Sequence, residues 1–260
     1  MPEYHLQLSD DDAGGYAFLP GDPGRVSLIA GHLSDAHHVV SNREFTTWTG
    51  FLDGTQVSVT STGIGSPSTA IAVEELCNIG VHTLVRLGSA AAIQPELRCG
   101  EVIIANAAVR EDGTTALYAP SNVPAVADLD TTVALREGAR QLGHPYRVGT
   151  VVASDGFWPA NQPDRMPQGD LLREHLVAYQ RCGVLATDME TAALFMVAQI
   201  RGVRAGSILG VVNTLGGTGE MDAHALPMDA TIASAIEGMR QLIRSDAAQQ
   251  ASISKISRSA

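Results

Sequence analysis

Short apolar segments alternate with longer amphipathic ones along most of this chain. Runs rich in apolar and β-branched residues predict strands at 57–62, 83–87, 102–109, 148–153 and 205–212. Apolar residues at helical spacing predict helices at 67–80, 128–142, 171–182, 191–201 and 230–244. Asp128 and Gly143 are residue types that begin and end helices. The repeated order of strand, glycine turn and helix predicts an α/β fold, with a parallel or mixed sheet covered on both faces.

The 260 residues are expected to form one domain. Hydrophobic residues make up 45% of the chain, no change in composition divides it, and it contains no internal repeat. A chain of this length buries roughly three quarters of its unfolded surface, so its core requires neither a disulfide nor a metal. We therefore predict a single domain over residues 1–244. The segment 245–260 lacks apolar periodicity and is expected to form a mobile tail.

Charge, cysteines and hydropathy limit the functional classes. The net charge of −11 disfavours nucleic acid as a partner, although a few arginines in one cleft can still bind a small anion. Cys77, Cys99 and Cys182 are odd in number and lack metal-ligand spacing, which indicates reduced thiols. The chain shows no basic and apolar leader and no run of about 18 apolar residues. We expect a cytoplasmic protein without membrane contact.

Three arginines are candidates for binding an anion. Arg25 follows a glycine- and proline-containing turn, which favours phosphate beside a helix start; a solvated arginine on a turn is the alternative. Arg86 lies within an apolar strand that ends near Ser89. Because burying an unpaired charge is costly, Arg86 indicates either a ligand site or an internal ion pair. By spacing alone, Arg43 and Glu44 are an exposed pair of little consequence.

Two carboxylates flank a methionine just before the predicted helix 191–201. Asp188 and Glu190 can accept hydrogen bonds from sugar hydroxyls, while the thioether of Met189 can lie against the apolar face of a sugar. The alternative is a capped helix start with Met189 in the core. The residues alone leave both interpretations open.

A polar loop with aromatic residues follows the predicted strand 148–153. The ring of Phe157 can stack on a planar base. The amide of Gln162 and the guanidinium of Arg165 can read a carbonyl and imide edge. A polar surface loop with a buried phenylalanine is the alternative.

Together these segments resemble the uridine phosphorylase branch of the nucleoside phosphorylase family. The resemblance runs in order over about residues 4–244, and each motif alone is modest. The motifs are His5-Leu, Pro20-Gly-Asp-Pro-Gly-Arg25, Arg43-Glu-Phe-Thr-Thr-Trp48, Ser61-Thr-Gly-Ile-Gly-Ser-Pro-Ser-Thr69, Ala72-Val-Glu-Glu-Leu76, Arg86-Leu-Gly-Ser89, Ala92-Ile-Gln-Pro95 and Asp188-Met-Glu190. The ordered set is far more specific than any one of them.

The resemblance implies a three-layer αβα subunit with a central mixed sheet, and a hexamer built as a trimer of dimers. It implies phosphorolysis of a nucleoside, with uridine as the expected substrate, to a free base and ribose 1-phosphate. Inorganic phosphate is then the co-substrate, and no cofactor is required. Some members of the family bind a monovalent cation, such as potassium, at the dimer interface.

The resemblance also assigns roles to positions of this chain. The phosphate site matches Gly21, Arg25, Arg43, Arg86 and Ser89, with Arg43 inserted by the dimer partner. The ribose site matches Asp188, Met189, Glu190 and a histidine of the partner at position His5; the base site matches Phe157, Gln162 and Arg165; the cation site matches Glu44, Ile64 and Ser68. Arg86, Glu190 and Arg165 are the expected catalytic residues.

Four positions depart from the family's pattern. Asp188 replaces the usual glutamate, and Gln162 and Arg165 are three positions apart instead of two. Thr214 stands where an arginine usually follows the asparagine of the late strand, and Ala91 replaces a glycine. Three of these changes surround the base or sugar, so a purine or broad-specificity phosphorylase stays open. A hydrolytic nucleosidase is a further alternative, although attack by water needs no phosphate-facing arginines. A non-catalytic nucleoside-binding protein is another, although the lack of an export signal disfavours a periplasmic one.

Overall fold

The protein, seen in a computed structural model that describes residues 1–215 and 228–259, is built around a mixed ten-stranded sheet. The strands are β1 (Tyr16–Leu19), β2 (Ser34–Asn42), β3 (Phe45–Leu52), β4 (Thr55–Thr60), β5 (Thr83–Ala92), β6 (Val102–Glu111), β7 (Ala125–Val126), β8 (Tyr146–Ser154), β9 (Ala186–Asp188) and β10 (Arg204–Thr214). The main path of the sheet runs β10-β6-β8-β9-β5-β1-β4-β3-β2. Because β10 also pairs with β5, the first five strands of this path close into a ring.

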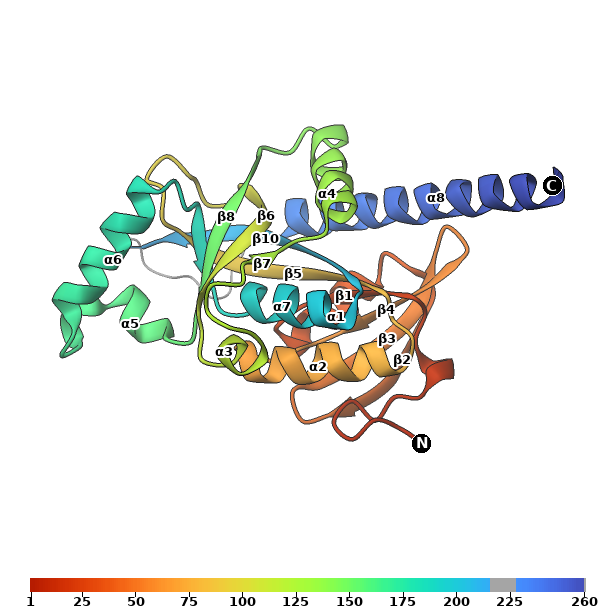
Figure 1. Cartoon of the computed structure of the whole chain (residues 1–260), viewed down its shortest axis with the longest axis horizontal. Helices are drawn as coiled ribbons and strands as arrows, with labels where there is room; N and C mark the ends of the chain where they lie inside the picture. The colour runs from red at the N-terminus through yellow and green to blue at the C-terminus, as the bar shows by residue number, and fades with distance from the viewer. Residues whose placement is uncertain (216–227, 260) are drawn as a thin grey trace.

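Helices cover both faces of the sheet (Figure 1). They are α1 (Val26–Ala30), α2 (Ser66–Asn78), α3 (Thr115–Tyr118), α4 (Leu129–Gln141), α5 (Phe157–Asn161), α6 (Gly169–Arg181), α7 (Thr191–Arg201) and α8 (Asp229–Ser259). One core cluster packs α2 and α7 against the sheet through residues such as Leu76 and Phe195. A second packs α1, α4 and α8 against the other face, through Ile29, Leu135 and Met239. The predicted α/β class with two covered faces is confirmed.

Each strand and helix predicted from the pattern overlaps an element of the structure. Helix α4 begins as expected, because the Asp128 carboxylate accepts a hydrogen bond from the N–H of Thr131 at 2.8 Å. It ends before Gly143, which has a φ of +70°. The helix predicted at 230–244 is too short: α8 continues to Ser259 and projects beyond the sheet (Figure 1). The mobility expected for 245–260 stays a prediction.

A polar network fastens α8 to the sheet just beyond the predicted helix end. Asp246 accepts a hydrogen bond from the hydroxyl of Tyr16 at 2.6 Å and pairs with the guanidinium of Arg204 at 2.5 Å. Tyr16 lies on β1 and Arg204 begins β10. Sequence periodicity does not reveal such a contact, because it joins residues far apart in the chain.

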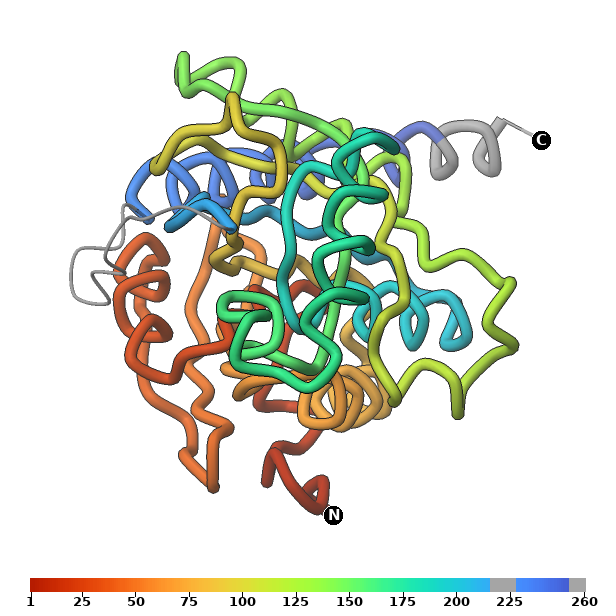
Figure 2. Tube along the Cα trace, turned by 90° about the vertical axis from the view of Figure 1, so that its left-hand side faces the viewer, coloured from red at the N-terminus to blue at the C-terminus, as the bar shows by residue number. Residues whose placement is uncertain are grey.

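The second half of β5 runs between β9 and β10 in the closed ring. Ala91 pairs with Thr187 on one side and with Asn213 on the other. Thr187 in turn pairs with Val152, near the end of β8. Four chain segments that are distant in sequence therefore meet at one end of the ring. The segment from α5 to α6 extends over that end (Figures 1 and 2).

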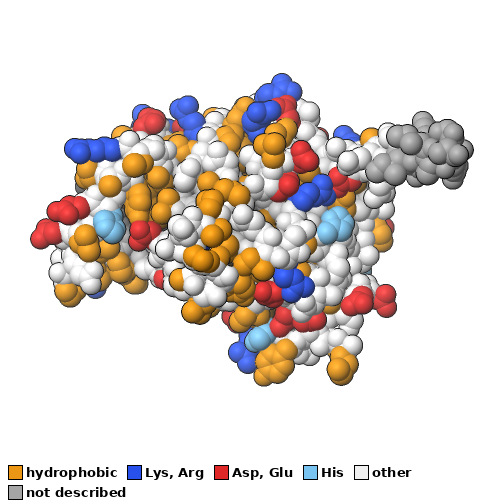
Figure 3. Space-filling model, viewed as in Figure 1, with side chains coloured by type: hydrophobic (Ala, Val, Ile, Leu, Met, Phe, Trp, Pro, Cys, Tyr) orange, Lys and Arg blue, Asp and Glu red, His pale blue; other side chains and the backbone are white. Residues whose placement is uncertain are grey.

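The described surface shows mixed charge. On the face seen in Figure 3, Lys and Arg side chains are scattered among Asp and Glu rather than gathered in one basic tract. Within residues 1–215 and 228–259, no helix has the length and hydropathy needed to cross a membrane.

Candidate active site

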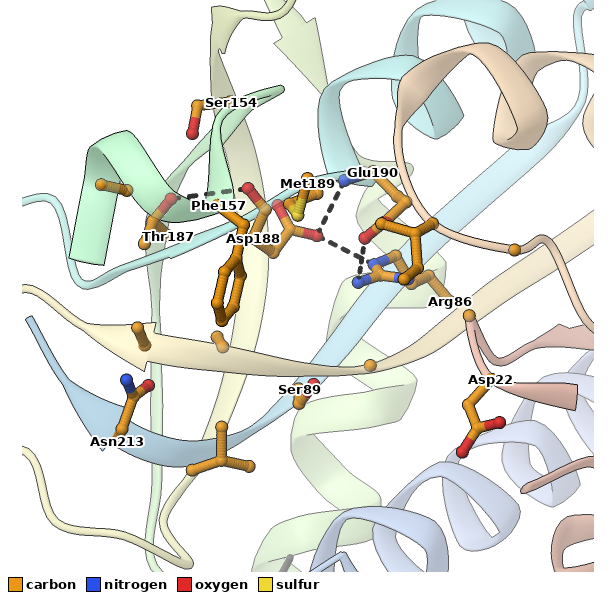
Figure 4. Close-up of a pocket in the computed structure, with 18 of the residues that line it drawn as sticks. Asp22, Arg86, Ser89, Ser154, Phe157, Thr187, Asp188, Met189, Glu190 and Asn213 are labelled. Carbon is orange, nitrogen blue, oxygen red and sulfur yellow. Dashed lines mark hydrogen bonds and ion pairs between the residues drawn. The ribbon is translucent and has the colours of Figure 1, made fainter. Parts of the chain in front are cut away.

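A cavity of about 510 Å³ opens at the end of the strand ring. Its size falls in the range of small-molecule binding sites. Figure 4 shows Asp22 and Arg86 toward one end, and Phe157 and Asn213 toward the other. Ten of the predicted site residues line it: Gly21, Arg25, Glu44, Ile64, Arg86, Ser89, Phe157, Asp188, Met189 and Glu190. These ten residues come from six separate segments of the sequence.

Arg86 is the buried cation of this site, with 4% of its surface exposed. Its Nε donates to Asp188 at 2.9 Å, and its Nη2 pairs with Glu190 at 2.6 Å (Figure 4). Burial lowers the pKa of Arg86, but the Glu190 and Asp188 carboxylates raise it more, so the guanidinium stays charged. Its Nη1 has no hydrogen-bond partner among the described residues. An unpaired buried donor of this kind is usually satisfied by a water, an ion or a ligand bound beside it.

Two glycines leave room for this guanidinium. Gly88 lies two residues after Arg86, hence on the same face of β5. A Cβ added at Gly88 would lie 2.6 Å from Nη2 of Arg86, closer than any ordinary contact. A Cβ added at Gly21 would lie 3.2 Å from the carbonyl oxygen of Gly63 and 3.9 Å from Nη1 of Arg86. Gly21 therefore borders the unpartnered nitrogen of Arg86.

Arg25 faces the same end of the cavity. Asp22 begins the 3-10 turn η2 (Pro23–Arg25) by accepting from the N–H of Gly24 at 2.8 Å. The Arg25 side chain is 13% exposed and lies 3.9 Å from Asp22. Burial lowers the pKa of Arg25. The charge of Asp22 raises this pKa, and the charge of Arg86 lowers it further. Two cations that repel each other across a cavity favour an anion between them.

Asp188 and Glu190 are held in place just before α7 by contacts within the protein, and their role toward a sugar stays a prediction. Asp188 Oδ2 accepts from the N–H of Thr191, the first residue of α7, at 3.0 Å, and the same oxygen binds Arg86. Glu190 Oε1 accepts from the N–H of Gly65 at 2.6 Å. Burial raises the pKa of Glu190 and Asp188 raises it further, although Arg86 lowers it.

Met189, between these two carboxylates, is not a core residue. Its side chain is half-buried and lines the cavity. The thioether is therefore placed where an apolar sugar face can contact it. The core alternative for Met189 is wrong.

The far end of the cavity contains Phe157 but neither of its predicted partners. Phe157 begins α5 and its residue is 43% exposed, so the ring is accessible to a ligand. Gln162 and Arg165 do not line the cavity: Arg165 donates to Gln162, and its guanidinium lies 5.9 Å from the ring centre of Trp158. The structure instead brings Asn161 to this end of the site.

Asn161 and Asn213, which line the cavity beside Phe157, were not among the predicted site residues. The Nδ2 of Asn213 donates to Oδ1 of Asn161 at 3.2 Å. One feature of the sequence could have indicated Asn213: it is an asparagine at the end of an apolar strand, and Thr214 follows it in place of an arginine. Nothing in the local sequence connects it with Asn161, 52 positions earlier.

Residues 16–245 match the family model of the Phosphorylase superfamily. The chain belongs to this family. It is 42% identical over 246 residues to a uridine phosphorylase of Treponema pallidum (strain Nichols), covering 94% of this chain and 95% of that protein. It is 42% identical over 214 residues to a uridine phosphorylase of Escherichia coli (strain K12), covering 80% and 85%. A guanosine phosphorylase of Halorubrum lacusprofundi (strain ATCC 49239 / DSM 5036 / JCM 8891 / ACAM 34) is 37% identical over 211 residues, covering 81% and 83%.

In this Phosphorylase-superfamily chain, His5 and Arg43 do not line their own cavity. Nδ1 of His5 lies 2.6 Å from the Glu75 carboxylate. Arg43 is exposed at the β2–β3 turn, with a φ of +54° that strains a residue with a side chain. The side chain of Asn42 donates to the carbonyl oxygen of His5 at 2.7 Å, so His5 and the β2–β3 turn share one surface.

The three residues predicted for a cation lie together at the mouth of the cavity. The hydroxyl of Ser68 donates to the carbonyl oxygen of Ile64 at 3.1 Å. A Cβ added at Gly63 would contact both Glu44, at 2.6 Å, and Ser68, at 3.3 Å. Within residues 1–215 and 228–259, no group of three or more His, Cys, Asp or Glu is arranged to hold a metal ion.

Proposed function

We propose that this chain uses inorganic phosphate to cleave uridine into uracil and ribose 1-phosphate. The observation that carries the proposal is the buried Arg86, fixed by Asp188 and Glu190 while its Nη1 borders the cavity without a partner in the described residues. Family membership makes the chain a pentosyltransferase. The uridine phosphorylases among its relatives support uridine as the substrate.

In the proposed mechanism, phosphate is bound by Arg86, Arg25 and Ser89, with Arg43 supplied by a second subunit. One phosphate oxygen attacks the anomeric carbon on the face opposite the base. The new C–O bond forms as the glycosidic C–N bond breaks, and the electron pair of the C–N bond leaves with the base. The transition state has oxocarbenium character, so the phosphate negative charge stabilises it. No covalent enzyme intermediate is required.

The sugar and the base are positioned by separate groups. Glu190 accepts a hydrogen bond from a ribose hydroxyl and Met189 contacts the sugar, which holds the anomeric carbon in line with phosphate. The ring of Phe157 stacks on the base. Gln162 and Arg165 remain predicted partners of the leaving base. Their side chains reach it only if residues 162–165 turn toward the cavity when substrate binds.

We further propose that the active sites are shared between subunits of a hexamer built from dimers. His5 and Arg43 do not line their own cavity but share a surface, which suits delivery to a neighbour. Ile64 is 77% exposed at the cavity mouth, an apolar side chain that a second subunit would cover. Glu44, Ile64 and Ser68 would then hold a potassium ion at this interface. The proposed setting is nucleoside salvage in the cytoplasm.

The test is a panel of uridine, inosine and guanosine, assayed with and without phosphate. We expect phosphate-dependent release of uracil, with formation of ribose 1-phosphate. Release of base without phosphate would identify a hydrolase instead, and binding without turnover would identify a non-catalytic protein. The guanosine phosphorylase relative favours a second candidate, a purine phosphorylase. Cleavage of inosine or guanosine, with uridine untouched, would support it.

A further inference from the structure

The base end of the cavity is lined by neutral polar side chains. The described residues there offer Ser154, Asn161, Thr187 and Asn213. The Asp188 carboxylate also belongs to the lining but is fully buried, with Oδ2 bound to Arg86 and Oδ1 without a hydrogen-bond partner among the described residues. Asn161 ends α5, and Asn213 lies on β10 beside Ala91. Their two amides meet across the end of the site. A neutral amide pair recognises the arrangement of hydrogen-bond donors and acceptors on a base rather than the charge of the base.

The orientation of both amides follows from one backbone group. The carbonyl oxygen of Phe157 can only accept, and it lies 2.8 Å from the Asn161 amide. Asn161 must therefore turn its Nδ2 toward Phe157, which turns its Oδ1 toward Asn213. Asn213 must in turn present Nδ2 to Asn161. A primary amide has two N–H groups and one carbonyl oxygen. Within residues 1–215 and 228–259, a second N–H and Oδ1 of Asn213 therefore remain for a ligand.

We propose that Asn213, oriented by Asn161, is the residue that selects the base. This inference rests on the proposed phosphorolysis. The second N–H of Asn213 donates to a carbonyl of the base, and its Oδ1 accepts from the neighbouring ring N–H. Uracil, hypoxanthine and guanine each present a carbonyl oxygen beside a ring N–H. Cytosine and adenine present an amino group beside an unprotonated ring nitrogen, so their pattern is reversed and the fixed amide mismatches at both positions.

Asn161 acts as a positioning residue in this arrangement. Without it, the Asn213 amide can rotate by half a turn and present the reverse pattern. Both amides are held by nearby backbone. Phe157 and Asn161 belong to the same turn of α5, and Asn213 is held in the sheet by pairing with β5. Recognition groups held by strands and hydrogen bonds are placed more precisely than groups on loops. Gln162 and Arg165, by contrast, bind each other outside the cavity.

The experiment compares Asn213→Leu, Asn213→Ser and Asn161→Ala with the matched control Asn122→Ala, at an exposed turn remote from the cavity lining. Four quantities are measured: kcat/KM for uridine, KM for phosphate, inhibition by uracil and by cytosine, and melting temperature. In the wild type, uracil should inhibit at least about 10-fold more strongly than cytosine, because a mismatched edge leaves polar groups unpaired. The melting temperature separates misfolded variants from specific effects.

For Asn213→Leu, kcat/KM for uridine should fall on the order of 100-fold at unchanged KM for phosphate. Asn213→Ser should also lower kcat/KM for uridine, and it replaces the leucine variant in the test if that variant does not fold. Asn161→Ala should bring the inhibition constants of uracil and cytosine within a few-fold of each other, a change that mere loss of stability does not produce. Asn122→Ala should match the wild type.

Two results would overturn the inference. One is an unchanged uracil-to-cytosine ratio in folded Asn213 and Asn161 variants. The other is loss of that discrimination in Arg165→Ala while both asparagine variants keep it, which would assign the base edge to Arg165. Failure of the underlying function is distinguishable, because the wild-type protein would then release no base in the presence of phosphate.

Discussion

Gly88→Ala should impair phosphorolysis although it removes no functional group from the site. The added Cβ would lie 2.6 Å from Nη2 and 2.7 Å from Cζ of Arg86, and 2.8 Å from a methyl carbon of Leu209. The methyl group has no alternative position, because Gly88 belongs to the paired strand β5. The Arg86 side chain must therefore move.

The size of that movement sets the expected loss. An ordinary carbon contact needs about 3.5 Å, so the guanidinium must retreat by about 1 Å. A retreat of this size lengthens its 2.6 Å ion pair with Glu190 beyond hydrogen-bond range. Displacements of about 1 Å in a catalytic group cost roughly 100-fold in rate. This corresponds to about 2.7 kcal/mol of transition-state stabilisation.

The assay is steady-state phosphorolysis of uridine over a range of phosphate concentrations. We expect kcat/KM for phosphate to fall about 100-fold in Gly88→Ala. Gly31→Ala is the matched control, because Gly31 has an ordinary φ of −59° and a Cβ there meets its nearest neighbour at 3.4 Å. Wild-type kinetics in a folded Gly88→Ala protein would refute the reasoning, since they would show that the position of Arg86 does not limit the reaction.

Three further predictions address other parts of the structure. Mixing inactive Arg43→Ala and Arg86→Ala subunits should restore activity, because a mixed dimer contains one intact shared site; verified mixed oligomers without activity would argue for separate sites. Asp246→Asn should lower the free energy of unfolding by about 1–3 kcal/mol at neutral pH, measured by urea denaturation, because its carboxylate accepts charged hydrogen bonds. The hydrogen bond from Arg204 lowers the pKa of Asp246 below its ordinary 3.8, so this stabilisation is complete above that pH and disappears as pH falls through the lower folded value. The two stability curves should therefore converge in acid, and a constant gap would contradict the assignment. Burial raises the pKa of Glu190, so activity should fall in acid with an apparent pKa above the ordinary 4.5, and Glu190→Gln should lose this limb in a pH profile of kcat/KM; an unchanged limb in the variant would assign it to another group.

The local elements were predictable because their signals are local. Helix α7 matches the predicted 191–201 at both ends, and α4 has the expected cap at Asp128. Strand β5 extends to Ala92, beyond the predicted 83–87, because pairing with β10 and β9 holds a glycine- and alanine-rich stretch with little strand preference of its own. The length of α8 was missed for the same reason, since its continuation is fastened by Asp246 to distant residues.

Most residues predicted for phosphate and ribose line the cavity, whereas Gln162 and Arg165 of the predicted base site do not. A glycine turn and an arginine in an apolar strand can be recognised in the sequence alone, and the resemblance supplied the roles expected of these residues. The lining beside Phe157 depends on which way the side chains of residues 161–165 point, and the sequence does not show this. The structure pairs Arg165 with Gln162 outside the cavity and places Asn161 inside it.

By itself, then, the sequence determined the α/β class, the approximate boundaries of most of the ten elements that it predicted, and the candidate phosphate and sugar residues. These follow from periodicity, glycine positions and residue chemistry within short windows. Only the tertiary structure decided which polar side chains meet. Arg86 and Asp188 are 102 residues apart, and Asn161 and Asn213 are 52 apart. Closure of the strand ring brings each pair within hydrogen-bond distance, and local composition contains no information about that closure.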